Sequence, residues 1–256
     1  MAMTVTFLGT GTSCGVPVIG CQCEVCRSTD PHDKRLRCSL LVETPTTRIL
    51  VDCGPDFRQQ ILPHPFRRID AILVTHAHYD HMGGMDDIRP YCQFGDVNVY
   101  ANAEACNGML HMLPYCFADN RYPGVPAIGL HEIGHGQVLQ IGDIEVLPVE
   151  VMHGLLPILG FRFGPVAYIT DMKTIDDSRA KLLDGIDTLI VNALRFDKPH
   201  HSHQLVDDAI AFARRVSARR TWLVHMCHDI GLHVDVNSRR LPPDIQLAYD
   251  GQVLMF

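Results

Sequence analysis

Four residues that can bind a metal ion lie within six positions, directly after an apolar run. They are His76, His78, Asp80 and His81, and the run covers residues 71–74. A short apolar run bounded by a turn is typical of a buried strand, so these side chains should lie on the loop that leaves its C-terminal end. A His/Asp cluster of this density indicates metal binding rather than a polar surface loop.

The spacing of the four residues suits two metal ions rather than one. His76 and His78 are two positions apart and can direct their rings at one ion, while Asp80 and His81 can face a neighbouring ion. The pattern H-x-H-x-D-H resembles the signature of the metallo-β-lactamase superfamily. Such a site needs further ligands from other parts of the chain.

Three later apolar strands each lead into a residue of the same kind. The strand 148–152 is followed by His153, the strand 166–170 by Asp171, and the strand 221–224 by His225. One such residue alone is usually an ordinary loop residue. Four coincident placements on one chain, His76 included, indicate one shared site.

These residues form two expected ligand sets joined by one carboxylate. We expect the first ion to bind His76, His78 and His153, the second to bind Asp80, His81 and His225, and Asp171 to bridge them. Because no thiolate is among them, Zn and Mn are both suitable. Two divalent ions roughly 3.5–4 Å apart lower the pKa of a shared water toward about 7, and attack by the metal-bridging hydroxide suits phosphodiester hydrolysis. Asp80 is therefore a candidate catalytic residue as well as a ligand.

A second metal-binding motif, His131-Glu132-Ile133-Gly134-His135, does not fit its usual setting. H-E-x-x-H binds zinc when both histidines share one face of a helix, but three glycines break any helix here. The following residues alternate around Gly142-Asp143 and predict a hairpin. A second hairpin is expected at the C-terminus, with strands 245–249 and 252–256 on either side of Asp250-Gly251.

Length, charge and hydrophobicity limit the class of protein. A chain of 256 residues with 46% apolar content can build one sizeable α/β domain, and we expect residues 1–256 to form a single hydrolase domain. A net charge of −7 argues against a protein that binds long nucleic acid, because neutralising the phosphates needs a basic surface. No run is long enough for a membrane span, and the N-terminus lacks a signal-peptide pattern, so a cytoplasmic protein is expected.

The full motif set resembles the phosphoribosyl 1,2-cyclic phosphate phosphodiesterase (PhnP) group of phosphonate breakdown, within the dinuclear phosphodiesterase branch of the superfamily. The segments that carry the resemblance are 9–12, 20–26, 52–58 and 225–228. It implies a four-layer αββα sandwich, hydrolysis of a small cyclic or simple phosphodiester, and a homodimer. It also implies that Asp52 supports the ligand loop without binding metal.

The resemblance further implies a general acid on the segment before the last long helix. Three histidines lie there, His200, His201 and His203, and the family pattern favours His203. A histidine with a pKa near 6.5 is a suitable proton donor to a leaving alkoxide.

Ten cysteines in a cytoplasmic chain favour metal binding over disulfides. Cys21, Cys23 and Cys26 can wrap one tetrahedral Zn, with His228 as the fourth ligand that the family offers, Cys38 as an alternative and Cys14 as a weaker one. Because protein would fill all four positions, this third ion should be structural.

Other functions remain open at this point. A tRNA 3′-processing endonuclease of the same superfamily is the nearest enzymatic alternative, although the acidic charge counts against it. The coenzyme-biosynthesis protein PqqB shares a Cys-rich N-terminal segment, and a non-catalytic metal-binding protein is the alternative from another class. No residue identifies the substrate, although Arg89 and Arg195 lie near the motif loops.

Overall fold

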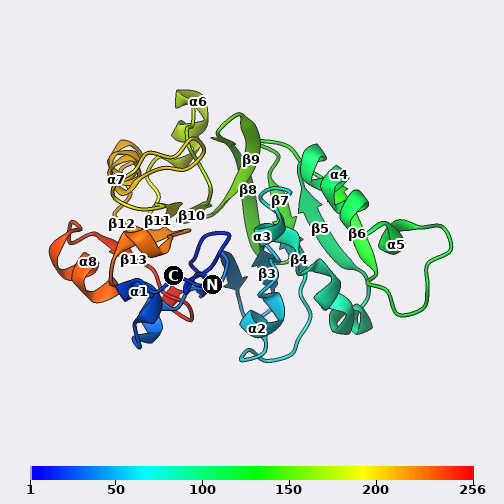
Figure 1. Cartoon of the computed structure of the whole chain (residues 1–256). Helices are drawn as coiled ribbons and strands as arrows, with labels where there is room; N and C mark the ends of the chain where they lie inside the picture. Colours follow the sequence, from blue (N-terminus) through cyan, green and yellow to red (C-terminus); the bar gives the residue numbers. More distant parts are fainter. Residues whose placement is uncertain (1) are drawn as a thin grey trace.

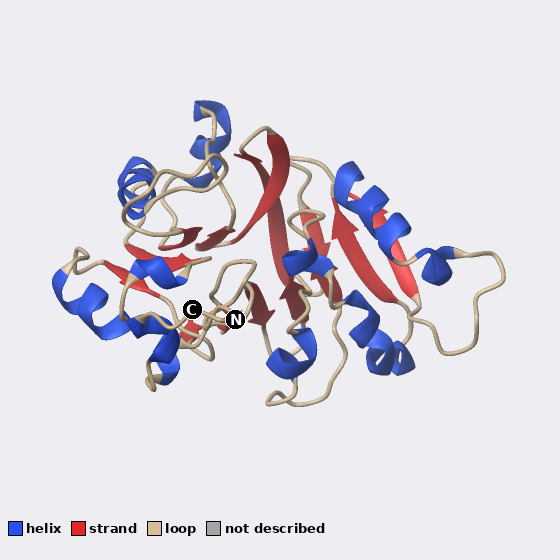
Figure 2. Ribbon diagram, in the orientation of Figure 1, coloured by secondary structure: helices blue, strands red, loops and turns tan. Residues whose placement is uncertain are grey.

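Two sheets of seven strands pack face to face within residues 2–256, the part of the chain that this computed structural model describes (Figures 1 and 2). Helices cover the outer face of each sheet. The predicted four-layer αββα sandwich is therefore confirmed. The first half of the chain builds most of one sheet, and the second half builds the other.

The first sheet has the strand order β14-β1-β2-β3-β4-β5-β6. Its strands are β1 (Thr4–Gly9), β2 (Ser39–Glu43), β3 (Arg48–Val51), β4 (Ala71–Leu73), β5 (Val97–Ala101), β6 (Ile128–Glu132) and β14 (Val253–Met255). Neighbours are antiparallel from β14 to β3 and parallel from β3 to β6.

The second sheet repeats this arrangement in the order β13-β12-β11-β10-β9-β8-β7. Its strands are β7 (Leu139–Ile141), β8 (Ile144–His153), β9 (Leu156–Phe163), β10 (Val166–Ile169), β11 (Thr188–Asn192), β12 (Arg220–Val224) and β13 (Ile245–Leu247). Neighbours are antiparallel from β7 to β10 and parallel from β10 to β13. Because the carboxyl ends of parallel strands meet at one edge, each sheet gathers its loops there.

The helices divide between the two outer faces. The first sheet carries α2 (Phe57–Ile61), α3 (Tyr79–Met82), the 3₁₀ helix η2 (Met85–Phe94), α4 (Ala103–Met112) and α5 (Pro114–Phe117). The second carries α6 (Asp177–Ala180), η3 (Lys181–Leu183), α7 (Val206–Arg215), η4 (His228–Ile230) and α8 (His233–Arg239). The short α1 (Glu24–Arg27) and η1 (Pro31–Asp33) precede β2. Among the described residues, no helix has both the length and the apolar character needed to cross a bilayer.

The core consists of three buried layers. The central layer lies between the sheets and contains Phe7 and Leu40 from the first sheet and Phe161 and Tyr168 from the second, all nearly inaccessible. Two further layers lie between each sheet and its helices. Burial on both faces explains why the strands are almost continuously apolar.

The C-terminal hairpin prediction is wrong. β13 pairs with β12 in the second sheet, whereas β14 pairs with β1 in the first, so the Asp250-Gly251 turn carries the chain from one sheet to the other. The Asp250 carboxylate accepts hydrogen bonds from the Thr10 hydroxyl and the Leu36 amide at 2.7 and 2.6 Å, and these contacts hold the turn in place. Two adjacent strands with a turn look the same in sequence whether they pair or separate.

The prediction that the H-E-x-x-H segment is not helical is confirmed. His131 and Glu132 end strand β6, and no helix includes them. The predicted hairpin that follows is formed by β7 and β8, with Gly142 at φ 55° in its turn.

Candidate metal centre

The histidine-rich segment leaves the carboxyl end of β4 and turns into helix α3. His76 is buried on the loop, His78 is exposed at the position before the helix, and Asp80 and His81 lie in the helix itself. Gly54 permits this approach, because a Cβ there would lie 2.1 Å from the Asp80 carbonyl oxygen. The segment thus presents two residues from a loop and two from a helix to the same space.

The second sheet supplies the other three expected ligands from its strand ends. His153 is the last residue of β8, Asp171 follows β10, and His225 follows β12. Asp171 and His225 adopt left-handed backbone conformations, with φ of 56° and 55°. Such conformations are unfavourable for residues other than glycine and concentrate at functional sites.

The seven side chains come together in two adjoining groups, in the division that the sequence predicts. The potential ligand atoms of His76, His78 and His153 lie within 4.8 Å of one another, and so do those of Asp80, His81, Asp171 and His225.

Asp171 lies between the two groups and directs one oxygen toward each. Its Oδ1 is 3.5 Å from His81 Nε2 and 3.3 Å from His225 Nε2. Its Oδ2 is 3.8 Å from His76 Nε2. This is the placement that a bridging carboxylate requires.

Hydrogen bonds fix the orientation of three of the histidine rings. Nδ1 of His81 lies 2.7 Å from Asp52 Oδ2, and Nδ1 of His153 lies 2.7 Å from the Asp171 carbonyl oxygen. Because both partners only accept, each Nδ1 carries a proton, and Nε2 is the nitrogen of each ring that faces the cluster. Nδ1 of His76 lies 3.0 Å from the Thr75 hydroxyl, which itself donates to Asp52. Metal-binding histidines usually have such partners on their second nitrogen.

Nε2 of His81 and Nε2 of His225 are two of the buried nitrogen atoms that have no hydrogen-bond partner within residues 2–256. Unpaired polar atoms in the interior are costly and need an explanation. Both atoms face Asp80 and Asp171. Imidazole nitrogens and carboxylates that converge on one point are a donor set for a divalent cation.

The electrostatics of the cluster also favour cations. Burial alone would raise the pKa values of Asp80 and Asp171, but His225 and His81 outweigh it and hold both pKa values below the usual range. Burial lowers the pKa of His76 well below its usual value, which keeps that ring neutral. Burial acts the same way on His81, yet Asp171 and Asp52 raise its pKa well above the usual value. Asp80 and Asp171 are therefore ionised, and positive charge beside them stabilises them.

His203 is the one of the three candidate acids that adjoins the cluster. Its ring centroid is 4.7 Å from that of His153 and 4.8 Å from that of His225, and its Nδ1 is 4.0 Å from Asp171 Oδ2. His200 lies one ring farther out, at 4.8 Å from His203, and His201 stacks on His200. Burial and then the neighbouring His225 lower the pKa of His203 to about 3.

The three N-terminal cysteines meet His228, as the family pattern suggests. Its Nδ1 lies 3.2, 3.3 and 3.5 Å from the sulfurs of Cys21, Cys23 and Cys26. Tetrahedral zinc would set S···N distances of about 3.6 Å. A hydrogen bond from the Cys26 amide is the main cause that lowers the pKa of Cys23 to about 6. The alternative ligand Cys38 lies elsewhere, in the buried layer between the sheets.

Two supporting residues were not recognised from the sequence. Thr75 donates its hydroxyl and amide to Asp52 and so joins β3 to the ligand loop. Asn192 binds both backbone groups of Met172 through its side-chain amide and holds the loop that carries Asp171. Each is a polar residue at the end of an apolar strand, which is the only signal that the sequence offers.

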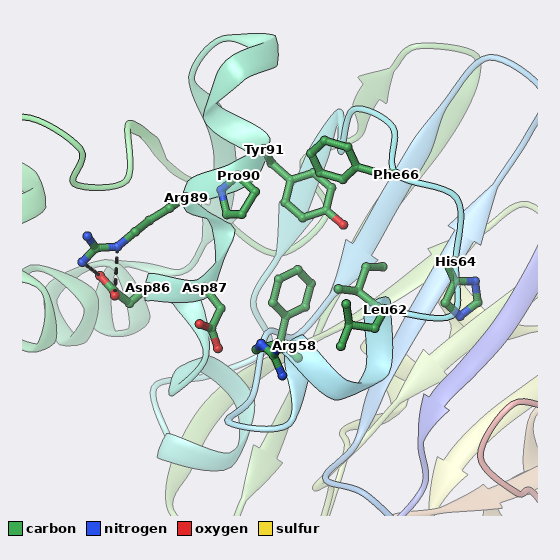
Figure 3. A pocket seen from close by; sticks show the side chains of 11 residues that line it. Arg58, Leu62, His64, Phe66, Asp86, Asp87, Arg89, Pro90 and Tyr91 are labelled. Carbon is green, nitrogen blue, oxygen red and sulfur yellow. Dashed lines mark hydrogen bonds and ion pairs between the residues drawn. The ribbon is translucent and has the colours of Figure 1, made fainter.

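A large apolar cavity, about 540 Å³, lies away from this cluster, between α2 and η2 (Figure 3). Phe57, Leu62, Phe66 and Tyr91 line it, and Arg89 pairs with Asp86 at its edge. None of the seven converging side chains contributes to it. The chemistry of the chain is therefore assigned to the histidine cluster and not to this cavity.

Comparison with known proteins agrees with the fold and the cluster. Residues 47–226 match the family described as "Beta-lactamase superfamily domain". The crystal structure of a diphosphatase from the PhnP family shares 40% sequence identity and a TM-score of 0.92, covering 100% of this chain and 98% of that chain. The chain therefore belongs to the metallo-β-lactamase superfamily and, within it, to the PhnP group. Its described residues form a domain of the metal-dependent hydrolase type.

Two relatives have names that differ from that of the diphosphatase. An octanoyltransferase from Porphyromonas gingivalis is 43% identical over 250 residues, which are 97% of this chain and 51% of that protein. A ribonuclease Z from a Bradyrhizobium species is 33% identical over 142 residues, 53% of this chain and 46% of the relative. The chain thus spans about half the length of these relatives.

Proposed function

We propose that this chain is a dinuclear metal-dependent phosphodiesterase that acts on a small cyclic or simple phosphodiester or diphosphate, such as phosphoribosyl 1,2-cyclic phosphate. The observation that carries the proposal is the position of Asp171, with one carboxylate oxygen toward each ligand group. The similarity to a PhnP-family diphosphatase supports a phosphate-ester substrate. The single-domain organisation, cytoplasmic location and homodimer stay predictions of the sequence.

The donor set divides as the two ligand groups do. His76, His78 and His153 would hold one Zn or Mn ion, Asp80, His81 and His225 would hold the other, and Asp171 would contact both. The cysteine cluster with His228 would hold one structural Zn. When bound, two divalent ions supply an activated water and offset the charge of a phosphate.

The protein's own groups have separate roles in this reaction. Asp80 keeps its negative charge across the physiological pH range because its pKa is lowered, so it can accept a hydrogen bond from the attacking water and orient it. Asp52, through Thr75 and His81, keeps two ligand rings in place. Burial of the cluster limits competing water and strengthens these interactions.

His203 would assist departure of the leaving oxygen. Its lowered pKa makes the ring neutral at pH 7, so it donates a hydrogen bond to that oxygen, and an adjacent phosphate anion favours its protonation. Turnover of His203→Ala should fall by roughly 10²–10⁴-fold on substrates with poor leaving groups and far less on an activated aryl phosphodiester. His201→Ala, on the outer side of His200, is the matched control. Equal losses on both kinds of substrate would deny His203 the acid role.

A substrate panel tests the activity itself. Metal-loaded protein should hydrolyse ribose 1,2-cyclic phosphates, 2′,3′-cyclic nucleotides or a diphosphate ester faster than pre-tRNA. Cleavage of pre-tRNA alone would support the ribonuclease Z alternative, which the partial similarity to that enzyme favours. Absence of hydrolysis of every substrate by protein with both ions bound would contradict the proposal.

A further inference from the structure

The ring of His203, the proposed acid, is not fixed through its Nδ1 atom. That atom is buried and has no hydrogen-bond partner within residues 2–256. The ring packs against those of His153, His200 and His225, with centroids 4.7, 4.8 and 4.8 Å away. Its direction toward the cluster therefore depends on this packing and on the backbone that carries it.

Hydrogen bonds at and beside His203 fix that backbone. The Gln204 amide donates to the Met172 carbonyl at 3.2 Å, and the Gln204 carbonyl accepts from the Leu194 amide at 3.0 Å. The carbonyl oxygen of His203 itself accepts a hydrogen bond from Nζ of Lys173 at 3.1 Å. Because this last donor is charged, its bond is roughly twice as strong as one between neutral groups. Lys173 thus makes a strong contact with the residue that carries the ring.

The backbone of Lys173 is tied to the part of the chain that carries proposed ligands. Lys173 follows Asp171 by two positions, and its amide donates to the Met152 carbonyl at 2.7 Å. Met152 precedes His153 at the end of β8. The side chain of Lys173 therefore connects a fixed point beside two proposed ligands to the residue that would act as the acid.

The Asp208 carboxylate is a second and weaker partner of this lysine. Its Oδ2 lies 3.9 Å from Lys173 Nζ, whereas the same oxygen accepts a hydrogen bond from the Leu205 amide at 3.0 Å, at the start of α7. The Lys173 side chain is 30% exposed, so water screens this ion pair. The carbonyl of His203 is thus the closer partner of the ammonium group.

We propose that Lys173 is a positioning residue for His203: it holds the carbonyl of that residue so that the ring stays directed at the cluster. A general acid must lie within hydrogen-bond reach of the leaving oxygen, and a displacement of about 1 Å can cost about a factor of 100 in rate. The inference rests on the proposed phosphodiesterase function and gives a part in it to a residue outside the ligand set.

The first test removes the ammonium group and keeps the length of the side chain. In Lys173→Met, kcat on substrates with poor leaving groups should fall by roughly 10–100-fold, while kcat on an activated aryl phosphodiester and KM for both should change little. Lys173→Arg keeps a charged donor and should recover most of the lost activity. Lys181→Met, which alters an exposed lysine in η3, is the matched control. Should Lys173→Met fail to fold, Lys173→Gln, which keeps a neutral donor, replaces it.

A double variant shows whether the lysine acts through the histidine. Adding Lys173→Met to His203→Ala should cause no further loss on poor leaving groups, because the group that the lysine positions is already absent. A loss in the double variant that multiplies the two single losses would overturn the proposal. Equal losses on both kinds of substrate in Lys173→Met would overturn it as well, because they would show general support of the site.

A measurement of the ring itself keeps the test independent of turnover. In Zn-loaded protein with ¹⁵N-labelled histidine, the NMR signal of the His203 ring is the one that His203→Ala removes. Lys173→Met should shift or broaden that signal, and Lys181→Met should not. If wild type with both ions bound hydrolyses no substrate, the proposed function fails, but a changed signal would still support the positioning role. An unchanged signal in Lys173→Met would overturn it.

Discussion

Asp52 shows how one carboxylate can order a site that it does not enter. It is fully buried, adopts φ 60°, and accepts hydrogen bonds from the Thr75 amide and hydroxyl and from His81 Nδ1. Burial raises its pKa, while His81 and Thr75 oppose that change. The resemblance to the family predicted this supporting role of Asp52. The role of Thr75 could not be predicted, because Asp52 lies 23 residues away and becomes its neighbour only when β3 pairs with β4.

Asp52→Asn should weaken metal binding while leaving the seven proposed ligands unchanged. The new amide NH₂ can meet the Nδ1–H of His81 donor to donor, so that the ring loses its fixed orientation. Partners of this kind usually contribute about 10–100-fold in metal affinity, and competition with a chromogenic chelator would measure the loss. Asp207→Asn, at an exposed position in α7, is the control. Unchanged affinity in Asp52→Asn would contradict the assigned role.

His233 predicts a pH dependence of stability away from the metal centre. Burial, followed by the Arg35 guanidinium and His32, lowers the pKa of His233 to about 4 from the usual 6.5. The unfolded chain therefore binds more protons than the folded one between these values, so this contribution to stability is full above pH 6.5 and is lost as the pH falls through 4.

The melting temperature of wild type should consequently fall more steeply between pH 6.5 and pH 4 than that of His233→Asn. Other titrating groups are common to both proteins, so the difference between the two curves isolates this residue. His111→Asn, on the exposed face of α4, should follow the wild-type curve. Parallel curves for His233→Asn and wild type would show that the ring does not titrate as described.

At the scale of elements, the proposed structural Zn would hold the cysteine segment in shape. Helix α1 has only four residues, too few to be stable alone, and its buried contacts form a small cluster around Val16, Val25 and Cys26. His228 connects this segment to β12, the strand that His225 follows. The cysteine spacing predicted the cluster, but the choice of His228 over Cys38 depended on which strands become neighbours.

Cys23→Ser should remove one Zn per chain and lower stability without removing the pair of ions in the histidine cluster. A loss of about 3 kcal/mol, the upper end for ordinary single substitutions, would lower Tm by roughly 6–12 °C in a chain of this size. Metal analysis and a melting curve measure both effects. Cys14→Ser, an exposed cysteine outside the cluster, is the control. Unchanged zinc content in Cys23→Ser would refute the structural site.

The same scale shows where local patterns mislead. The β7–β8 hairpin was predicted correctly from a Gly-Asp turn, whereas the strands on either side of Asp250-Gly251 separated into different sheets. The difference lies in distant partners, since β14 completes the edge beside β1 and β13 completes the edge beside β12. Alternation and turn residues identify strands, but pairing is decided by burial across the whole fold.

For the whole molecule, the central feature is a site shared between two sheets. The proposed ligands that follow β4 or lie in α3 come from the first sheet and its connections, and those that end β8 or follow β10 and β12 come from the second. All seven were predicted as one cluster because each lies in or just after the loop at a strand's end, a relation visible in sequence. The placement of Arg195 and Lys198 around Asp229 was not predicted, because it depends on the packing of β11 beside β12.

The two-metal site shared between the sheets is best tested by a crystal structure of metal-loaded protein, with anomalous scattering at the Zn or Mn edge. We expect two adjacent peaks, one bound by His76, His78 and His153, the other by Asp80, His81 and His225, with Asp171 contacting both. A single peak, peaks elsewhere, or ligands from only one of the two sheets would contradict it.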